Sequence, residues 1–141
     1  MAGTIDMQLM RYINLFERTT QVQTMKVFLY NNQIVFAVPE SKVSLAIGKG
    51  AVNVKRLNEI LRRKIKVVAM PSVDSSEEIG KFVEDVVAPI DFNKIEVKDD
   101  SAILTAGRQS KAALIGRGRQ REKELADVLR NFFGIVRLKI I

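Results

Sequence analysis

The sequence predicts an α+β protein built from two copies of one unit, each with the element order α-β-β-α-α-β and a three-stranded sheet. Two observations support this prediction. Segments with the apolar spacing of helices alternate with short β-rich runs, and the whole pattern recurs at an offset of 68 residues. The repeat is clearest where IGKGAVNVKRL (47–57) aligns with IGRGRQREKEL (115–125). Such a shared register indicates duplication of a unit of about 70 residues.

The first copy, residues 1–72, is expected to begin with a helix. Its apolar positions are Ile5, Leu9, Ile13 and Phe16, and Thr4 is a suitable N-cap with Asp6 in the first turn. The β-rich runs TMKVFLY and QIVFAV follow, joined by Asn31-Asn32. Because asparagine tolerates positive φ, these runs predict a hairpin, which Pro39 ends.

The first copy then turns helical again around a glycine pair. A short helix over about 41–47 is expected to lead into Gly48. A second helix follows, with an apolar face formed by Val54, Leu57, Ile60 and Leu61. KIKVVAM (64–70) closes the unit as a strand.

The second copy, residues 73–141, repeats this order. Ser75 and Glu78 predict a capping box, and the helix that follows has the apolar positions Ile79, Phe82, Val83, Val86 and Val87. KIEVK and AILTA form a hairpin around Asp99-Asp100, Gly107 opens a loop, and a short helix reaches Ile115. The long helix beyond carries Leu125, Val128, Leu129, Phe132 and Phe133.

The chain closes with GIVRLKII, whose alternation points Val136, Leu138 and Ile140 inward. The link between the copies, PSVDS (71–75), is short and contains a proline, so we expect the units to pack together as one rigid body.

Composition excludes several kinds of chemistry. The 141 residues include no cysteine and no histidine, which excludes disulfides, thiolate zinc sites, histidine acid–base catalysis and cysteine nucleophiles. No apolar run has the roughly 18 residues of a membrane span, and the N-terminus does not resemble a secretory signal. We therefore expect a cytoplasmic protein with no membrane partner, no cofactor, no metal and no enzymatic activity.

The charge is uneven along the chain and favours an anionic partner. The formal net charge is +7, yet residues 75–104 hold eight acidic and only three basic side chains. The segments on either side are both strongly basic. Two basic blocks around an acidic one predict two patches that face a nucleic acid, with the acidic segment turned away.

The two glycine loops admit several interpretations. Neither has the G-x-x-x-x-G-K-[ST] spacing of a Walker A loop, and the third glycine of a dinucleotide fingerprint is missing. A basic helix-turn-helix protein on duplex DNA remains an alternative, because a glycine turn joins two predicted helices. A second alternative is that each glycine loop is only a structural turn between two helices, with no ligand.

The element order with a glycine loop between the two middle helices resembles the type II K-homology (KH) RNA-binding domain, in both copies and over nearly the full chain. VSLAIGKGAVNVKRL is, more narrowly, similar to the KH segments of NusA, and two fused type II KH units resemble the archaeal NusA-like family. The resemblance implies binding of single-stranded RNA in transcription termination or antitermination. It also implies the transcription machinery as a partner.

The expected RNA contacts follow from the loops and the helix after each. Glycines let a sugar–phosphate chain approach the backbone, and the free N–H groups of a helix N-terminus favour phosphate. The predicted RNA-binding residues are Ile47, Gly48, Lys49, Gly50, Ala51, Asn53 and Lys55 in the first copy, and Ile115, Gly116, Arg117, Gly118, Arg119, Arg121 and Lys123 in the second. An aliphatic groove floor of Val43, Ala46, Ile47 and Val54 is expected beside the first loop.

Both loops depart from the G-x-x-G pattern of the KH family. Ala51 and Arg119 stand at the second glycine, and Arg121 replaces the family asparagine that the first copy retains as Asn53. We therefore expect the first loop to hold RNA through close backbone contact and the second through phosphate electrostatics.

Overall fold

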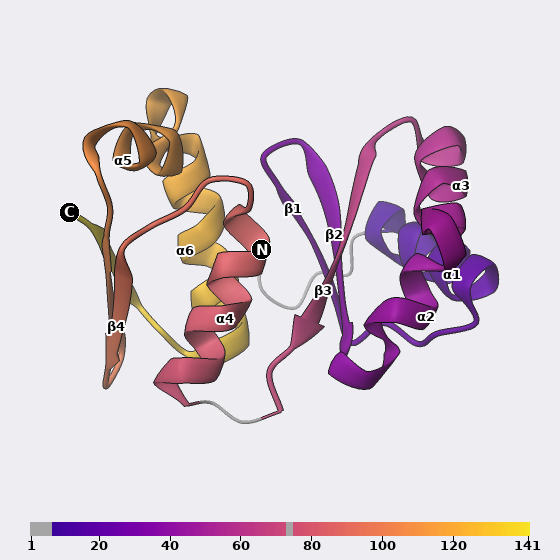
Figure 1. The fold of residues 1–141 in the computed structure, drawn as a ribbon, viewed down its shortest axis with the longest axis horizontal. Coiled ribbons are helices and arrows are strands. Elements are labelled where there is room, and N and C mark those ends of the chain that lie inside the picture. Colours follow the sequence, from indigo (N-terminus) through magenta and orange to yellow (C-terminus); the bar gives the residue numbers. More distant parts are fainter. Residues whose placement is uncertain (1–6, 73–74) are drawn as a thin grey trace. The chain divides into compact units, whose positions relative to one another are not determined.

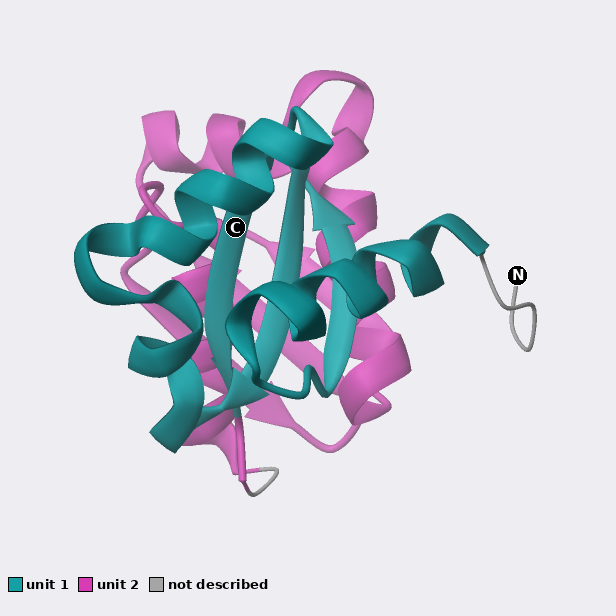
Figure 2. Cartoon of the chain, turned by 90° about the vertical axis from the view of Figure 1, so that its right-hand side faces the viewer, with its two compact units in different colours: residues 1–70 teal, residues 71–141 magenta. Residues whose placement is uncertain are grey.

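The computed structural model describes residues 7–72 and 75–141, and the chain divides into two compact units, 1–70 and 71–141 (Figure 2). The helices and strands of the first unit are α1 (Met7–Thr20), β1 (Lys26–Tyr30), β2 (Gln33–Pro39), α2 (Val43–Ile47), α3 (Val52–Leu61) and β3 (Lys64–Met70). Two short 3-10 turns, Glu40–Lys42 and Lys49–Ala51, precede α2 and α3.

The second unit repeats the series (Figure 1). Its elements are α4 (Ser76–Val87), β4 (Lys94–Lys98), β5 (Ser101–Thr105), α5 (Arg108–Ile115), α6 (Gln120–Phe133) and β6 (Arg137–Ile140), with a 3-10 turn at Arg117–Arg119. The predicted α+β class and the order α-β-β-α-α-β are thus confirmed in both units.

Each unit contains one three-stranded sheet of the same topology. The spatial order is β1-β2-β3 in the first and β4-β5-β6 in the second. The hairpin strands are antiparallel, and the last strand pairs parallel to the middle one. The predicted Asn31-Asn32 turn is confirmed, because both residues have positive φ (52° and 64°). In the first unit, the helices lie together on one face of the sheet (Figure 2).

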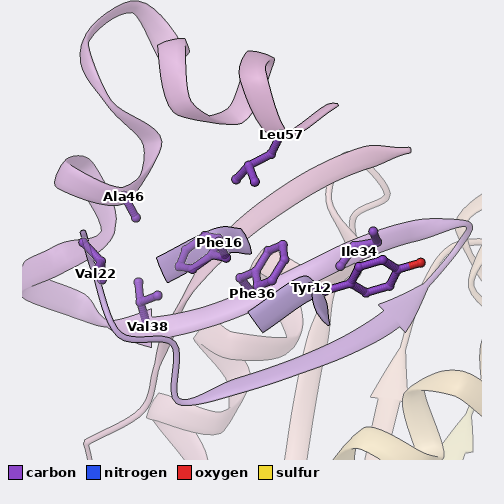
Figure 3. Close-up of a cluster of buried hydrophobic side chains, with 8 residues drawn as sticks. All are labelled: Tyr12, Phe16, Val22, Ile34, Phe36, Val38, Ala46 and Leu57. Carbon is purple, nitrogen blue, oxygen red and sulfur yellow. The ribbon is translucent and has the colours of Figure 1, made fainter. Parts of the chain in front are cut away.

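The core of the first unit lies between this helical layer and β2. Its buried side chains are Tyr12, Phe16, Val22, Ile34, Phe36, Val38, Ala46 and Leu57 (Figure 3). The rings of Phe16 from α1 and Phe36 from β2 stack with their centroids 4.2 Å apart. Because Ala46 and Leu57 join the same cluster, α2 and α3 are anchored on either side of the glycine loop that connects them.

The second unit is built from the residues that the apolar pattern predicted. All five predicted apolar positions of α4 are buried, as are Leu125, Val128 and Leu129 of α6. The Oγ of Ser75 accepts a hydrogen bond from the Glu78 N–H at 3.1 Å, which confirms the predicted cap of α4.

Two predicted inward side chains are exposed instead. Ile60, assigned to the apolar face of α3, is 51% exposed, because the core side of this helix is taken by Leu57. Val136 is 48% exposed, because it precedes β6 and its N–H donates to the Asp100 carbonyl. Its neighbour Ile135 is buried in its place. The predicted cap at Thr4, with Ile5 and Asp6, lies outside the described residues.

Within residues 7–72 and 75–141, none of the helices combines the length and the apolar character that crossing a membrane requires.

Candidate nucleic-acid interface

The two glycine loops have the same backbone conformation. We call them loop 1 (Gly48–Ala51) and loop 2 (Gly116–Arg119). The first glycine has φ 82° and ψ 162° in loop 1, and φ 75° and ψ 173° in loop 2. The second glycine has φ 64° and ψ 23° against φ 62° and ψ 21°. A difference in sequence between the copies therefore leaves the path of the chain unchanged.

The fourth residue of each loop is left-handed although it is not glycine. Ala51 has φ 60° and ψ 29°, and Arg119 has φ 63° and ψ 22°. The helix α3 begins one residue after Ala51, at Val52. Since an L-residue in this region costs about 1–2 kcal/mol, both loops retain a conformation that glycine would adopt more easily.

Matching backbone hydrogen bonds hold each loop. The N–H of Gly48 donates to Ser44 O at 3.0 Å, and the N–H of Gly116 donates to Ala112 O at 3.0 Å. The fourth residue donates its N–H to the first glycine's carbonyl, at 3.0 Å in loop 1 and 3.1 Å in loop 2. The loop is thus a rigid, closed turn.

A side chain from the following helix reaches back across each loop. The Nδ2 of Asn53 donates to the Leu45 carbonyl at 3.3 Å, and an Nη1 of Arg121 donates to the Ala113 carbonyl at 3.1 Å. Leu45 and Ala113 are themselves equivalent positions of the repeat. Asn53 and Arg121, both predicted as RNA contacts, brace the last turn of one helix against the first turn of the next.

This brace explains the need for the first glycine. A Cβ added to Gly48 would lie 2.9 Å from Val52 Cγ1 and 3.0 Å from Asn53 Nδ2. A Cβ on Gly116 would lie 3.0 Å from Arg121 Cγ. At the second glycine, Gly50 or Gly118, a Cβ would meet nothing within 4 Å. The first glycine is therefore packed, whereas the second faces open space that a ligand can enter.

Positive charge surrounds this open space. Lys49 and Lys55 of the first unit are exposed, as are Arg117, Arg119 and Lys123 of the second. The charge of Arg119 is partly neutralised, because its Nε forms an ion pair with Glu122 Oε1 at 2.8 Å. The N–H groups of Val52 and Gln120, the first of α3 and α6, donate to the Lys49 and Arg117 carbonyls. In the described part of the chain no N-cap side chain accepts a hydrogen bond from the N–H groups that follow.

Exposed aliphatic side chains lie beside loop 1. Leu45 is 55% exposed and Val52 is 50% exposed, and neither was predicted to be part of the site. Ala46, expected on the groove floor, is wholly buried in the core, while Val43, Ile47 and Val54 are half-buried. Loop 2 has Ala113 and Gln120 at the corresponding positions, so its surroundings offer less apolar surface.

The arrangement suits an anion that needs backbone access, charge and, at loop 1, an apolar neighbour. An uncapped helix N-terminus next to a lysine or arginine attracts phosphate, and an exposed aliphatic surface suits a base. Among the described residues, no group of three acidic, histidine or cysteine side chains could hold a metal ion.

Comparison with known proteins places the chain in a family, through a match that includes loop 1. The model of the KH domain matches residues 10–84 of this chain. Two curated archaeal proteins, each called probable transcription termination protein NusA, are similar over 92% of the chain. The protein of Methanocaldococcus jannaschii is 28% identical, with 70% of its length covered, and that of Methanococcus vannielii is 26% identical, with 74% covered.

A solved structure shows the same fold. The crystal structure of APE1850 matches 97% of this chain and 100% of its own, with a TM-score of 0.69 and 28% identity. The family match and the two relatives confirm the resemblance to NusA-like KH proteins that the duplicated loops suggested.

Proposed function

The chain belongs to the KH domain family, and from this premise we propose that it binds single-stranded RNA through loops 1 and 2, without chemical change to the RNA. We further propose that it acts as a NusA-like factor in transcription termination or antitermination, in contact with the transcription machinery in the cytoplasm. The second proposal draws on the relatives of M. jannaschii and M. vannielii, which are called probable transcription termination proteins.

One observation carries the RNA-binding proposal. The same strained backbone occurs twice, at two uncapped helix N-termini, although only the first glycine of each loop is packed against a side chain. Strain of this kind persists where the surrounding structure holds it in place, and it is concentrated at active sites and ligand clamps. Backbone N–H donors at a helix N-terminus, next to a lysine or arginine, are a typical phosphate-binding arrangement. A single-stranded RNA is flexible enough for its backbone to approach such a tight turn.

The proposed contacts are the residues predicted from the repeat, with different roles. Lys49, Gly50, Arg117 and Gly118 face the phosphates. Ile47, Ala51, Ile115 and Arg119 shape the turn around them, and Lys55 and Lys123 add charge from the first turns of α3 and α6. Asn53 and Arg121 act mainly as braces, so their loss should weaken binding by loosening the loop.

The test compares ligands and then variants. Fluorescence anisotropy with a single-stranded RNA and a duplex DNA of equal length separates this proposal from a helix-turn-helix protein. Tighter, sequence-selective binding to the duplex would refute it.

Lys49→Asp with Gly50→Asp should reduce RNA affinity by at least tenfold. The charge beside the phosphate is reversed, while the open space at Gly50 leaves the fold room for the new side chain. The matched control is Lys98→Asp with Gly134→Asp, because Gly134 is also left-handed, with φ 69°, and also has nothing within 4 Å. This control should change RNA affinity much less. Circular dichroism of both variants verifies that the fold is retained.

A further inference from the structure

A basic pocket lies at the end of α3 that is remote from loop 1. Its volume is about 490 Å³, and it is lined by Asn31, Asn32, Gln33, Arg62, Arg63 and Lys64. We call it the α3–β3 pocket. With 10 residues at 1.5 Å each, α3 separates the pocket from loop 1 by roughly 15 Å.

Two turns of the chain bring these residues together. Lys64 begins β3 directly opposite Gln33, the first residue of β2, so the α3–β3 turn and the hairpin turn lie at the same end of the sheet (Figure 1). Arg63 Nη2 makes a long contact, 3.5 Å, with Asn32 Oδ1. Asn58 Nδ2 donates to the Arg63 carbonyl at 2.8 Å and so fixes the turn.

The pocket gathers positive charge without a counter-charge. Three consecutive residues are cationic, the other lining side chains are amides, and in the described residues no carboxylate forms an ion pair with Arg62, Arg63 or Lys64. Like charges so close repel one another unless an anion joins them. Arginine binds phosphate through two parallel N–H donors, and lysine acts as a point charge.

Arg62 is held in a strained conformation. It ends α3 with φ 55° and ψ 36°, in the left-handed region. At the corresponding end of α6 the chain uses Gly134, with φ 69° and ψ 18°. Glycine is the usual residue at such a position, so an arginine there is retained against its backbone preference, and such strain is typical of functional sites.

The second unit shows that the fold does not require this pocket. Its hairpin turn carries the carboxylates of Asp99 and Asp100 where the first unit has asparagines. The chain entering β6 there reads Gly134, Ile135, Val136, and the Val136 N–H donates to the Asp100 carbonyl at 2.8 Å. In the second unit this place holds two carboxylates, two apolar residues and one cation, Arg137, which lies opposite Ser101 as Lys64 lies opposite Gln33. In the first unit it holds three cations and three amides, with no carboxylate.

We propose that the α3–β3 pocket is a second phosphate-binding subsite of the first unit. It takes a backbone phosphate of an RNA that extends beyond the nucleotides held at loop 1. The inference rests on the proposed function, since it assigns a further contact to the same ligand. It predicts that removing the charges of the pocket weakens the binding of a long RNA and leaves the binding of a short one unchanged.

The test uses two single-stranded RNAs, of four and twelve nucleotides, and two charge-matched variants. Arg63→Gln with Lys64→Gln removes two charges from the pocket. Arg11→Gln with Arg18→Gln removes two exposed charges from α1 of the same unit. We expect the pocket variant to bind the twelve-nucleotide RNA about tenfold more weakly. Its salt slope should flatten by roughly 1.4, or about 0.7 for each phosphate contact on a single strand.

The expected controls separate this subsite from loop 1. The pocket variant should bind the four-nucleotide RNA as the unchanged protein does, and the α1 variant should change either affinity less than twofold. Equal losses for the two variants, or equal losses for the two RNAs, would overturn the subsite alone. If the unchanged protein binds neither RNA, the proposed function fails, and the subsite fails with it.

Arg62→Gly gives an independent readout. We expect this substitution to raise the urea midpoint of the first unit, because glycine relieves the left-handed strain, while it lowers affinity for the twelve-nucleotide RNA several-fold. A merely structural arginine would lose stability and affinity together. A variant that loses stability, or that keeps full affinity, contradicts the assignment.

Discussion

Replacing Gly48 with alanine should destabilise the first unit far more than the same change two residues later. At Gly48 the backbone has φ 82° and ψ 162°, a region that is almost closed to L-residues and costs about 1–3 kcal/mol. The new Cβ would also lie 2.9 Å from Val52 Cγ1 and 3.0 Å from Asn53 Nδ2. Relieving that overlap moves the Asn53 brace, and we expect a total cost of about 2–4 kcal/mol.

Gly50→Ala is the matched control. Gly50 is left-handed as well, with φ 64° and ψ 23°, but a Cβ there meets nothing within 4 Å. Only the backbone preference changes, so the expected loss is about 1 kcal/mol. Gly116→Ala and Gly118→Ala repeat the comparison in the second unit, where the added Cβ at Gly116 meets Arg121 instead. That unit has no tyrosine, so its unfolding is followed by circular dichroism.

The assay exploits the distribution of aromatic residues. The chain has no tryptophan, and both tyrosines, Tyr12 and Tyr30, belong to the first unit and are buried. Tyrosine fluorescence in urea therefore reports unfolding of the first unit alone. If Gly48→Ala costs no more free energy of unfolding than Gly50→Ala, then the packed role of the first glycine is wrong.

Three further predictions concern the loops and the link. Ala51→Gly should stabilise the first unit by about 1 kcal/mol, because it removes left-handed strain; a lower urea midpoint by tyrosine fluorescence would contradict this. Arg117→Ala should flatten the salt dependence of RNA binding by roughly 0.7. Arg119→Ala should flatten it less, since its guanidinium already pairs with Glu122, and the reverse order in an anisotropy titration would refute the reasoning. A long Gly/Ser insertion after Ser72 should weaken binding of a long RNA but not of a four-nucleotide RNA; an unchanged affinity for the long RNA would show that the units bind independently.

Most of the fold could be predicted because its signals are local. The hairpin at Asn31-Asn32 and the cap at Ser75 each depend on a few adjacent residues, and α4 has a complete apolar stripe. The errors arose where tertiary context decides. The spacing of Ile60 fits the buried face of a helix, yet in α3 Leu57 is the buried residue and Ile60 is exposed.

The candidate site was predictable in position but less so in mechanism. The repeat located both loops, because their glycines align at a fixed offset. No sequence rule predicts that Ala51 or Arg119 is left-handed, since neither residue prefers that region. The bracing hydrogen bonds could not be predicted from the sequence either, because the two side chains that make them, an asparagine and an arginine, differ in size and charge. The common offset of Asn53 and Arg121 from their glycines was the one available signal.

The brace has a consequence for how such a loop can change over generations. A short amide in one copy and a long guanidinium in the other reach equivalent carbonyls and hold the same turn. The shape therefore depends on a hydrogen bond that chemically different residues can supply, while the outward residue next to it, lysine or arginine, is left free to vary. After duplication of such a unit, the ligand preference of one copy can therefore change by substitution in its loop while the backbone of the loop stays the same.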